Sequence, residues 1–317
     1  MLRILLVKTS SLGDIVHNLP VATDLMAALP GAEIDWVVEE NFAAIPKLHP
    51  AVRRVMPVAL RRWRKRWWRG DTRREVQAFL RELRGLSYDA VLDTQGLFKS
   101  ALIARAAHGL RYGLDWKASR EPVALFYDRT FHVPRRQQAV ERNRTLAAEA
   151  LRYTRAARVD YGICASPIDH RWLAADRYAV LVHATSASSK LWPEARWAAL
   201  GNALSARGVV SVLPWGTEGE HERSTRLRSL IAGSVLPPHL NLAEIAALLA
   251  KSHCAVGVDT GLTHLAGALG VATVGIYTAT DPGLTGLYGC ERAVNLGGDS
   301  VSPSVDDVML ALERVTR

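Results

Sequence analysis

Short apolar runs alternate with amphipathic stretches along the whole chain, and this alternation limits the fold more than any other feature of the sequence. The runs at 2–7, 33–38 and 89–94 have the length and apolar content of buried strands. The stretches at 14–29 and 98–108 place apolar residues at helical spacing. Strands that alternate with helices predict an α/β fold with mostly parallel sheets and helices on both faces.

The alternation starts again after residues 150–177, which lack strong periodicity and read as a linker. Beyond it we expect strands at 178–183, 209–214, 255–259 and 272–277, and helices at 194–206, 218–231, 242–251, 262–269 and 304–316. A chain of 317 residues is about twice the usual single-domain length. We therefore predict two doubly wound, Rossmann-like domains, 1–160 and 161–317, that face a central cleft where ligands bind at the strand ends. The closing helix is a candidate to pack back on the first domain.

Several classes of protein are disfavoured by what the sequence lacks. Its three cysteines are too few and too scattered for a disulfide framework, and no Cys/His spacing suits zinc. The N-terminal apolar run ends at Lys8, too early for a signal peptide or a membrane span. The glycine motifs of dinucleotide-binding enzymes and P-loop NTPases are absent, as are the serine-hydrolase and zincin signatures. These features predict a reduced, cytoplasmic chain without structural zinc.

The positive charge is concentrated in one segment. The chain carries a net charge of +9, and residues 53–74 alone hold ten basic residues and one acid, so the rest is neutral. Within this segment three tryptophans that we expect to be exposed, Trp63, Trp67 and Trp68, alternate with arginines. This pattern favours an anionic partner that the tryptophans contact. A solvated charge run and a nucleic-acid contact through base stacking are the alternatives. A single patch is a small footprint for nucleic acid.

The first strand leads directly into a loop of small polar residues, KTSSLGD at 8–14, before a helix. Backbone N–H groups and hydroxyls of such a loop can face an anion or a sugar, and Asp14 would lie at the helix start. Asp14 is therefore a candidate catalytic residue. The alternative is that it only caps the helix.

Two further segments suit a diphosphate. Thr185 and Ser186 follow the strand at 178–183, and Lys190 comes shortly after them. Asp259, Thr260 and Gly261 end another strand and open a helix whose first N–H groups can bind phosphate, with His264 in the same turn. A polar turn with a solvated lysine, and a capped helix with a surface histidine, are the alternatives. Together the two segments favour a nucleoside-diphosphate ligand.

A set of short motifs in both halves carries a wider resemblance: KTSSLGD (8–14), DWVVEE (35–40), IP (45–46), RRWRK (61–65), DTQGL (93–97) with KS (99–100), REP (120–122), AVER (139–142), KLWP (190–193), LPWG (213–216), DTG (259–261) and DPG (281–283). In this order they resemble the lipopolysaccharide heptosyltransferase I family, and RRWRK favours this family over heptosyltransferase II. The resemblance implies a GT-B fold. It also implies inverting transfer of L-glycero-D-manno-heptose from ADP-heptose to the first Kdo of Kdo2-lipid A, without a metal or other cofactor.

The resemblance also assigns roles to residues. It implies catalysis by Asp14 as the base, with Lys190 stabilising the leaving group. Donor contacts carried over by motif are Thr185, Ser186, Lys190, Glu220, Leu240, Asp259, Thr260, Gly261 and His264. Acceptor contacts are Ser11, Arg61, Arg64, Lys65, Arg120 and Arg142. It further implies docking on the cytoplasmic face of the inner membrane and no nucleic-acid partner. Heptosyltransferase II, a nucleotide-sugar epimerase of the same architecture and a nucleic-acid-binding protein remain the rival hypotheses.

Overall fold

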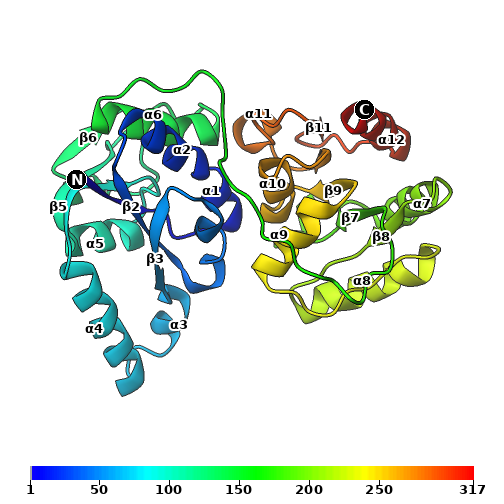
Figure 1. Cartoon of the computed structure of the whole chain (residues 1–317), viewed down its shortest axis with the longest axis horizontal. Helices are drawn as coiled ribbons and strands as arrows, with labels where there is room; N and C mark the ends of the chain where they lie inside the picture. Colours follow the sequence, from blue (N-terminus) through cyan, green and yellow to red (C-terminus); the bar gives the residue numbers. More distant parts are fainter. Residues whose placement is uncertain (1) are drawn as a thin grey trace. The chain divides into compact units, whose positions relative to one another are not determined.

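The computed structural model describes residues 2–317. The chain forms two compact units, residues 1–163 and 164–317, each built around its own parallel sheet (Figure 1). The division lies three residues from the boundary expected at 160/161. Each unit is described in turn.

The first unit has a six-stranded sheet in the order β3-β2-β1-β4-β5-β6, with every pair of neighbours parallel. This is the strand order of dinucleotide-binding Rossmann domains, which changes direction between the first and fourth strands. The strands are β1 (Arg3–Val7), β2 (Glu33–Glu39), β3 (Val52–Val58), β4 (Ser87–Asp93), β5 (His108–Leu114) and β6 (Arg129–Phe131).

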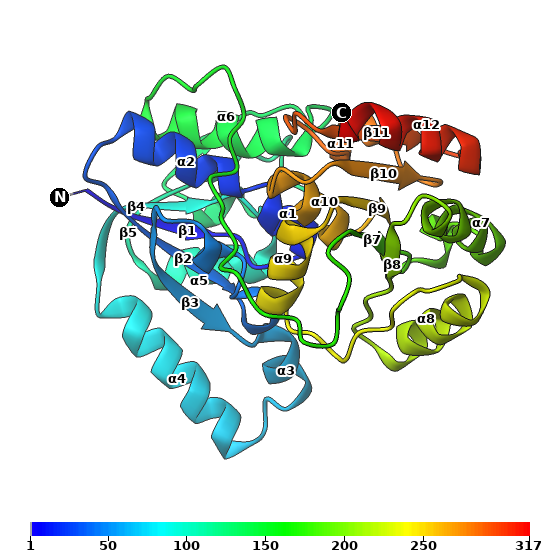
Figure 2. The same ribbon diagram turned by 45° about the vertical axis from the view of Figure 1, so that its right-hand side comes forward.

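Helices cover both faces of this sheet. α2 and α6 pack together on one face, and α4 and α5 lie on the other (Figure 2). The helices are α1 (Leu12–Val16), α2 (Leu19–Ala28), α3 (Leu60–Lys65), α4 (Gly70–Arg84), α5 (Phe98–Ala106) and α6 (Ala139–Leu151), with short 3-10 turns η1 (Glu40–Phe42), η2 (Pro46–Leu48) and η3 (Ala124–Phe126).

The single helix expected at 14–29 is wrong, because the structure divides it into α1 and α2. Pro20 explains the break. It has no N–H to donate to the carbonyl of Val16, and its ring clashes with that carbonyl in a continuous helix. The first helix therefore ends at Val16, and a new one begins with Pro20 in its first turn.

The second unit has a five-stranded parallel sheet in the order β11-β10-β9-β7-β8. Counted from its own first strand, this is the flavodoxin-like order, which changes direction between β7 and β9. The strands are β7 (Tyr178–Val182), β8 (Val210–Val212), β9 (Cys254–Val258), β10 (Thr273–Tyr277) and β11 (Ala293–Gly297). The helices are α7 (Glu194–Ser205), α8 (Glu218–Leu230), α9 (Leu242–Lys251), α10 (Gly261–Ala268), α11 (Pro282–Thr285) and α12 (Val305–Thr316), with the turn η4 (Ser188–Lys190).

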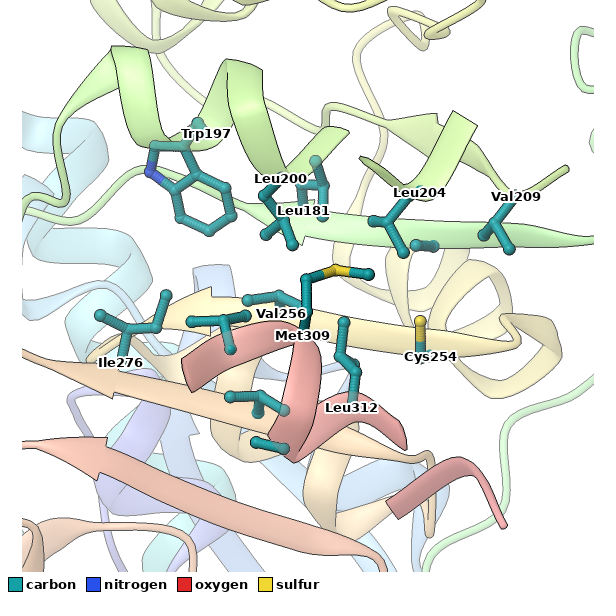
Figure 3. Close-up of a cluster of buried hydrophobic side chains, with 14 of the residues drawn as sticks. Leu181, Trp197, Leu200, Leu204, Val209, Cys254, Val256, Ile276, Met309 and Leu312 are labelled. Carbon is teal, nitrogen blue, oxygen red and sulfur yellow. The ribbon is translucent and has the colours of Figure 1, made fainter. Parts of the chain in front are cut away.

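The core of the second unit lies between its sheet and the helices α7, α8 and α12. Figure 3 shows Trp197 and Leu200 of α7 facing Met309 and Leu312 of α12 across strand residues such as Val256. The closing helix α12 packs on α7, β10 and β11 of its own unit. Trp192 and Trp197 are completely buried and meet edge to face, with ring centroids 5.1 Å apart. Aromatic pairs of this geometry add to the stability that burial provides.

No helix within residues 2–317 is both long enough and apolar enough to cross a membrane. Those residues also contain no group of three or more His, Cys, Asp or Glu side chains arranged to hold a metal ion.

Candidate functional site

In each unit, polar side chains gather where the strand order changes direction. Parallel α/β sheets bind ligands there, because the loops that follow the two central strands leave toward opposite faces and open a crevice. In the first unit these loops follow β1 and β4, and in the second they follow β7 and β9. The β1–β4 site consists of Lys8, Ser10, Ser11, Asp14 and Lys99. The β7–β9 site consists of Thr185, Lys190, Asp259, His264 and Thr280.

Asp14 is the third residue of α1, and its carboxylate turns back to the helix start. It accepts hydrogen bonds from the N–H of Ser11 at 2.7 Å and from the Ser11 hydroxyl at 3.0 Å. Ser11, rather than Asp14, is the N-cap residue, so the interpretation of Asp14 as an N-cap is wrong. Burial raises the pKa of Asp14, but the charge of Lys8 and the bonds from Ser11 outweigh burial and lower the pKa overall. The carboxylate is therefore ionised at neutral pH.

Lys8 is a buried cation at the end of β1. Its ammonium donates to the carbonyl of Thr94 at 2.7 Å and to Oδ1 of Asn143 at 3.3 Å. Burial lowers the pKa of Lys8, and the charge of Asp14 opposes that shift. Lys8 and Asp14 are thus an electrostatically coupled pair within the β1–β4 site.

The loop after β4 holds the loop after β1 in place. Oε1 of Gln95 accepts from the N–H groups of Thr9, at 2.9 Å, and Ser10, at 3.1 Å. Its amide nitrogen donates to the carbonyl of Ser10. Lys99, near the start of α5, donates to the Ser10 hydroxyl, and burial lowers the pKa of this lysine. Gln95 and Lys99 lie in two of the sequence motifs, but no role in the site was predicted for either of them.

Three arginines lie close enough to interact electrostatically beside this site. Burial, together with the charges of Arg120 and Arg135, lowers the pKa of Arg142. Arg142 donates through one terminal nitrogen to the carbonyl of Ala118, and its buried Nε has no hydrogen-bond partner among residues 2–317. The charges of Arg142 and Arg120 also lower the pKa of Lys8. Arg120, Arg135 and Arg142, the arginine cluster, therefore form a place for an anion, and Arg135 is a member that sequence reasoning missed.

Acidic residues from other segments neutralise part of the basic stretch. Arg53 pairs with Asp35 at 3.0 Å, and Arg62 pairs with Glu40 at 3.0 Å and with Glu75 at 2.8 Å. The basic residues of this stretch without an ion-pair partner among residues 2–317 include Arg61, Arg64, Lys65, Arg66 and Arg69. Residues 61–69, the basic segment, thus keep most of their positive charge free. The predicted contacts Arg61, Arg64 and Lys65 are among the free cations.

The expectation that three tryptophans of the basic segment are exposed is wrong for Trp63. Its indole N–H donates to Glu75 at 2.7 Å, and its ring packs on Phe79 in the core of the first unit. Trp67 and Trp68 are 65% and 61% exposed. The reason for the difference is that Trp63 lies inside α3 on the side that faces α4, whereas the other two follow the end of α3.

In the second unit Lys190 and Asp259 form an ion pair. The Lys190 ammonium lies 2.7 Å from Oδ2 of Asp259, which also accepts from the Thr280 hydroxyl at 2.7 Å. Nε2 of His264 lies 3.5 Å from the other carboxylate oxygen. Burial alone would raise the pKa of Asp259. The hydrogen bonds from His264, Lys190 and Thr280 outweigh burial, so the pKa lies below its ordinary value. The interpretation of Lys190 as a solvated lysine is therefore wrong, as is that of His264 as a surface residue, since His264 is buried.

The other predicted donor residues of this site lie beside that pair. The Thr185 hydroxyl donates to the carbonyl of Asp259 at 3.1 Å, and Ser186 is exposed next to it. Thr260 caps α10, and Gly261 is the first residue of that helix. The structure thus brings five predicted donor residues together at the carboxyl ends of β7 and β9: Thr185, Lys190, Asp259, Thr260 and His264.

Glu220 and Leu240 lie elsewhere in the unit. Glu220 closes the capping box of α8, where it accepts from the N–H of Gly216 at 2.7 Å and from that of Thr217 at 3.2 Å. Leu240 is buried just before α9. The Trp215 ring packs edge-on against His239, with centroids 5.2 Å apart, and so forms part of the same region.

Comparison with known proteins assigns the family. The family model of glycosyltransferase family 9 (heptosyltransferase) matches residues 76–310. The chain belongs to this family. A curated family 9 relative, lipopolysaccharide heptosyltransferase 1 of Escherichia coli K12, is 46% identical over 296 residues, which cover 92% of this chain and 93% of the relative.

Solved family 9 structures agree. Escherichia coli heptosyltransferase WaaC with ADP is 41% identical, with a TM-score of 0.90 over 99% of this chain and 100% of that chain. The same enzyme with ADP-2-deoxy-2-fluoro heptose has a TM-score of 0.87 at 41% identity and 99% coverage of both chains. Escherichia coli heptosyltransferase II has a TM-score of 0.76 at 20% identity and covers 99% of this chain and 98% of that chain, a likeness of fold alone. The expected GT-B fold, the enzyme class and the resemblance to heptosyltransferase I are confirmed.

Proposed function

We propose that this family 9 enzyme transfers L-glycero-D-manno-heptose from ADP-heptose to the first Kdo of Kdo2-lipid A, with inversion, in the biosynthesis of the lipopolysaccharide inner core. The observation that carries the proposal is the β7–β9 site, where a lysine lies beside a helix start in a chain 41% identical to an enzyme solved with ADP. The heptose analogue in the second structure of that enzyme supports the sugar. The name of the curated relatives supports the lipopolysaccharide acceptor.

Asp14 is the proposed base. The acceptor hydroxyl attacks the anomeric carbon from the face opposite ADP, the bond from that carbon to the β-phosphate oxygen breaks, and the hydroxyl proton passes to Asp14. Its lowered pKa makes Asp14 a weak base toward an unactivated alcohol. The transfer is therefore late, after bond formation to the positively charged sugar has made the hydroxyl acidic.

Lys190 and the start of α10 stabilise the departing ADP. Negative charge develops on the β-phosphate as the sugar leaves, and a cation and a helix N-terminus at that position lower the energy of the transition state. These groups supply the role that a metal ion has in many nucleotide-sugar enzymes, and we propose that the reaction needs no metal or other cofactor. Thr185, Ser186, Thr260 and Gly261 would hold the phosphate oxygens, and Glu220 and Leu240 would lie nearer the nucleoside.

The acceptor would bind the first unit through its anionic groups. The arginine cluster offers guanidinium groups for Kdo carboxylates, because planar bidentate pairing suits a carboxylate. Ser11 lies next to Asp14 and is placed to contact the same sugar. Arg61, Arg64 and Lys65 would contact carboxylates or lipid A phosphates.

Release of ADP from ADP-heptose, measured with and without Kdo2-lipid A, tests the whole proposal. We expect release only when the acceptor is present. Turnover of the donor without acceptor would favour an epimerase or hydrolase. No release in either mixture, with donor binding confirmed, would direct the test to heptosyltransferase II acceptors. Steep salt-dependent binding to DNA or RNA without ADP release would favour the nucleic-acid alternative.

The double variant Arg64→Ala/Lys65→Ala should raise the acceptor KM about tenfold or more and leave the donor KM unchanged, because two free cations are lost from the acceptor side only. The salt dependence of the acceptor KM should weaken as well. Arg207→Ala is the matched control, since Arg207 pairs with Glu313 on the second unit. An unchanged acceptor KM in the double variant would exclude these residues from acceptor binding.

We also propose that the enzyme docks on the cytoplasmic face of the inner membrane. Exposed Trp67 and Trp68 beside free cations suit an anionic headgroup layer. Vesicles containing anionic phospholipid should retain the wild-type protein in flotation, and Trp67→Ala/Trp68→Ala should be retained several-fold less. Trp116→Ala is a control for one exposed tryptophan outside the basic segment, and an equal loss there would argue against specific docking.

A further inference from the structure

An apolar cavity lies beside the β1–β4 site, and none of the roles proposed so far uses its apolar walls. Its volume is about 480 Å³, within the range of pockets that hold small organic ligands. Its walls come from α3, α4 and α5. The apolar lining residues are Leu60, Trp63, Val76, Phe79, Leu80, Leu102, Ile103 and Ala106.

The polar residues that line the cavity are mainly cationic: Arg61 and Arg64 of the basic segment, Lys99, and one acid, Glu39. Lys99 lies near Glu39 and Arg61, because the charges of both act on its pKa. Glu39 accepts from the backbone N–H of Arg61 at 3.1 Å. An apolar pocket with cations in its lining complements a molecule that has a hydrocarbon part and an anionic head.

Lys99 links this cavity to the catalytic region. Its ammonium donates to the Ser10 hydroxyl, and the charge of Asp14 opposes the lowering of its pKa by burial. From Lys99 the cavity follows α5 to Ala106, a distance of about 10 Å at the ordinary helical rise. The anionic end of a ligand in the cavity would therefore lie toward Asp14, and its hydrocarbon part would point away.

We propose that this cavity holds an acyl chain of an anionic glycolipid acceptor while the acceptor's sugar lies at Asp14. The inference rests on the proposed function. It adds that the enzyme recognises part of the lipid as well as the sugar. When the sugar moves from the membrane surface to Asp14, an acyl chain that enters the cavity leaves the lipid without being exposed to water. The apolar walls of the cavity then replace the hydrocarbon of the membrane around that chain.

The surface around the cavity supports the same occupant. Leu102, on the cavity wall, is 58% exposed. Phe98 of α5 and Leu125 of η3 are also exposed, and η3 contacts α5. These apolar side chains lie on the elements next to the cavity, as expected if hydrocarbon chains approach along α5.

The first test compares an acylated acceptor, Kdo2-lipid A, with its fully deacylated form. Ala106→Trp places an indole in the cavity, and Leu102→Gln makes its wall polar. We expect the ratio of kcat/KM for the acylated over the deacylated acceptor to fall at least tenfold in Ala106→Trp and about threefold in Leu102→Gln. Leu310→Gln, on α12 and 63% exposed, is the matched control and should keep the wild-type ratio. An unchanged ratio in both cavity variants would overturn the proposal.

The second test does not require turnover, so it separates failure of this proposal from failure of the proposed function. Calorimetric titration with decyl phosphate, below its micelle concentration, should show binding to the wild type and at least tenfold weaker binding to Ala106→Trp. Inorganic phosphate is the control for the head alone and should show no comparable difference. Equal binding of decyl phosphate to both proteins would overturn the proposal. So would a change in the sedimentation of Ala106→Trp from dimer to monomer, since the cavity would then be an interface between copies.

Discussion

The Asp14→Ala variant is expected to have a kcat about 10²- to 10⁴-fold below that of the wild type, the range for removal of a positioned base. The carboxylate is ionised and coupled to Lys8 at the carboxyl end of β1, where a parallel sheet places catalytic groups. Steady-state ADP release at saturating donor and acceptor measures the effect. Because the pKa of Asp14 is lowered, the acid limb of the wild-type kcat profile should lie below the range of an unperturbed aspartate.

The chain contains its own control for the capping role of Asp14. Asp307, at the start of α12, closes the same box with Ser304, accepting from its N–H at 2.8 Å and from its hydroxyl at 2.6 Å. Asp307→Ala removes the corresponding carboxylate of a capping box and should lower stability without touching the β1–β4 site. If both variants lose similar stability and Asp14→Ala loses less than tenfold in kcat, Asp14 is only a structural residue. Asp14→Asn should keep the cap in part and still lose activity.

Lys190→Ala is expected to lower kcat by about 10²- to 10³-fold, the effect of removing one preorganised electrostatic group from a transition state. Donor affinity should fall as well, because in the proposed complex the cation would also contact the diphosphate of the bound donor. Single-turnover rates together with ADP binding separate these two effects. A variant that binds ADP more weakly but keeps the wild-type kcat would remove Lys190 from the leaving-group role.

The matched control for Lys190 is Lys251→Ala, on the exposed last turn of α9 in the same unit. It removes one positive charge of the second unit away from the β7–β9 site and should change neither kcat nor donor affinity. Lys190→Arg keeps the positive charge but replaces the ammonium with a larger, planar guanidinium. We expect the kcat of Lys190→Arg to lie between those of Lys190→Ala and the wild type, because the guanidinium can still pair with Asp259.

Elements with a strong apolar period were predictable, and their type followed from the sequence. α9 lies at 242–251 as expected, and α7 ends one residue before its predicted limit. β3 and α4 were not predicted, because their many charged residues hide the apolar faces. β6 and β11 lie at sheet edges and are only partly buried, so their sequences carry little of the strand signal.

Site residues were predictable where they follow a strand within a short motif. The loops after β1, β7 and β9 are of this kind, so the sequence identified Asp14, Lys190 and Asp259 as candidates. Arg135 could not be found in this way, since it reaches its site from a loop whose position depends on the tertiary fold. Thr280 follows the predicted strand at 272–277 and precedes the DPG motif, so the same rule applied to it and it was missed. Trp63 shows the opposite error, because a local pattern cannot tell which side of a short helix is covered by the next one.

The ion pair between Lys190 and Asp259 has a consequence for the entropy of donor binding. A free lysine side chain loses up to about 2 kcal/mol of rotamer freedom when it is ordered. Here Asp259 holds the ammonium at 2.7 Å without a ligand, and the Thr278 hydroxyl donates to the carbonyl of Ser189 at 3.0 Å and so fixes the adjacent turn. The Lys190 side chain therefore loses its rotamer freedom when the protein folds, before the donor binds. If the donor binds as proposed, its diphosphate would meet a cation that is already oriented, and its association would lose little conformational entropy at this position.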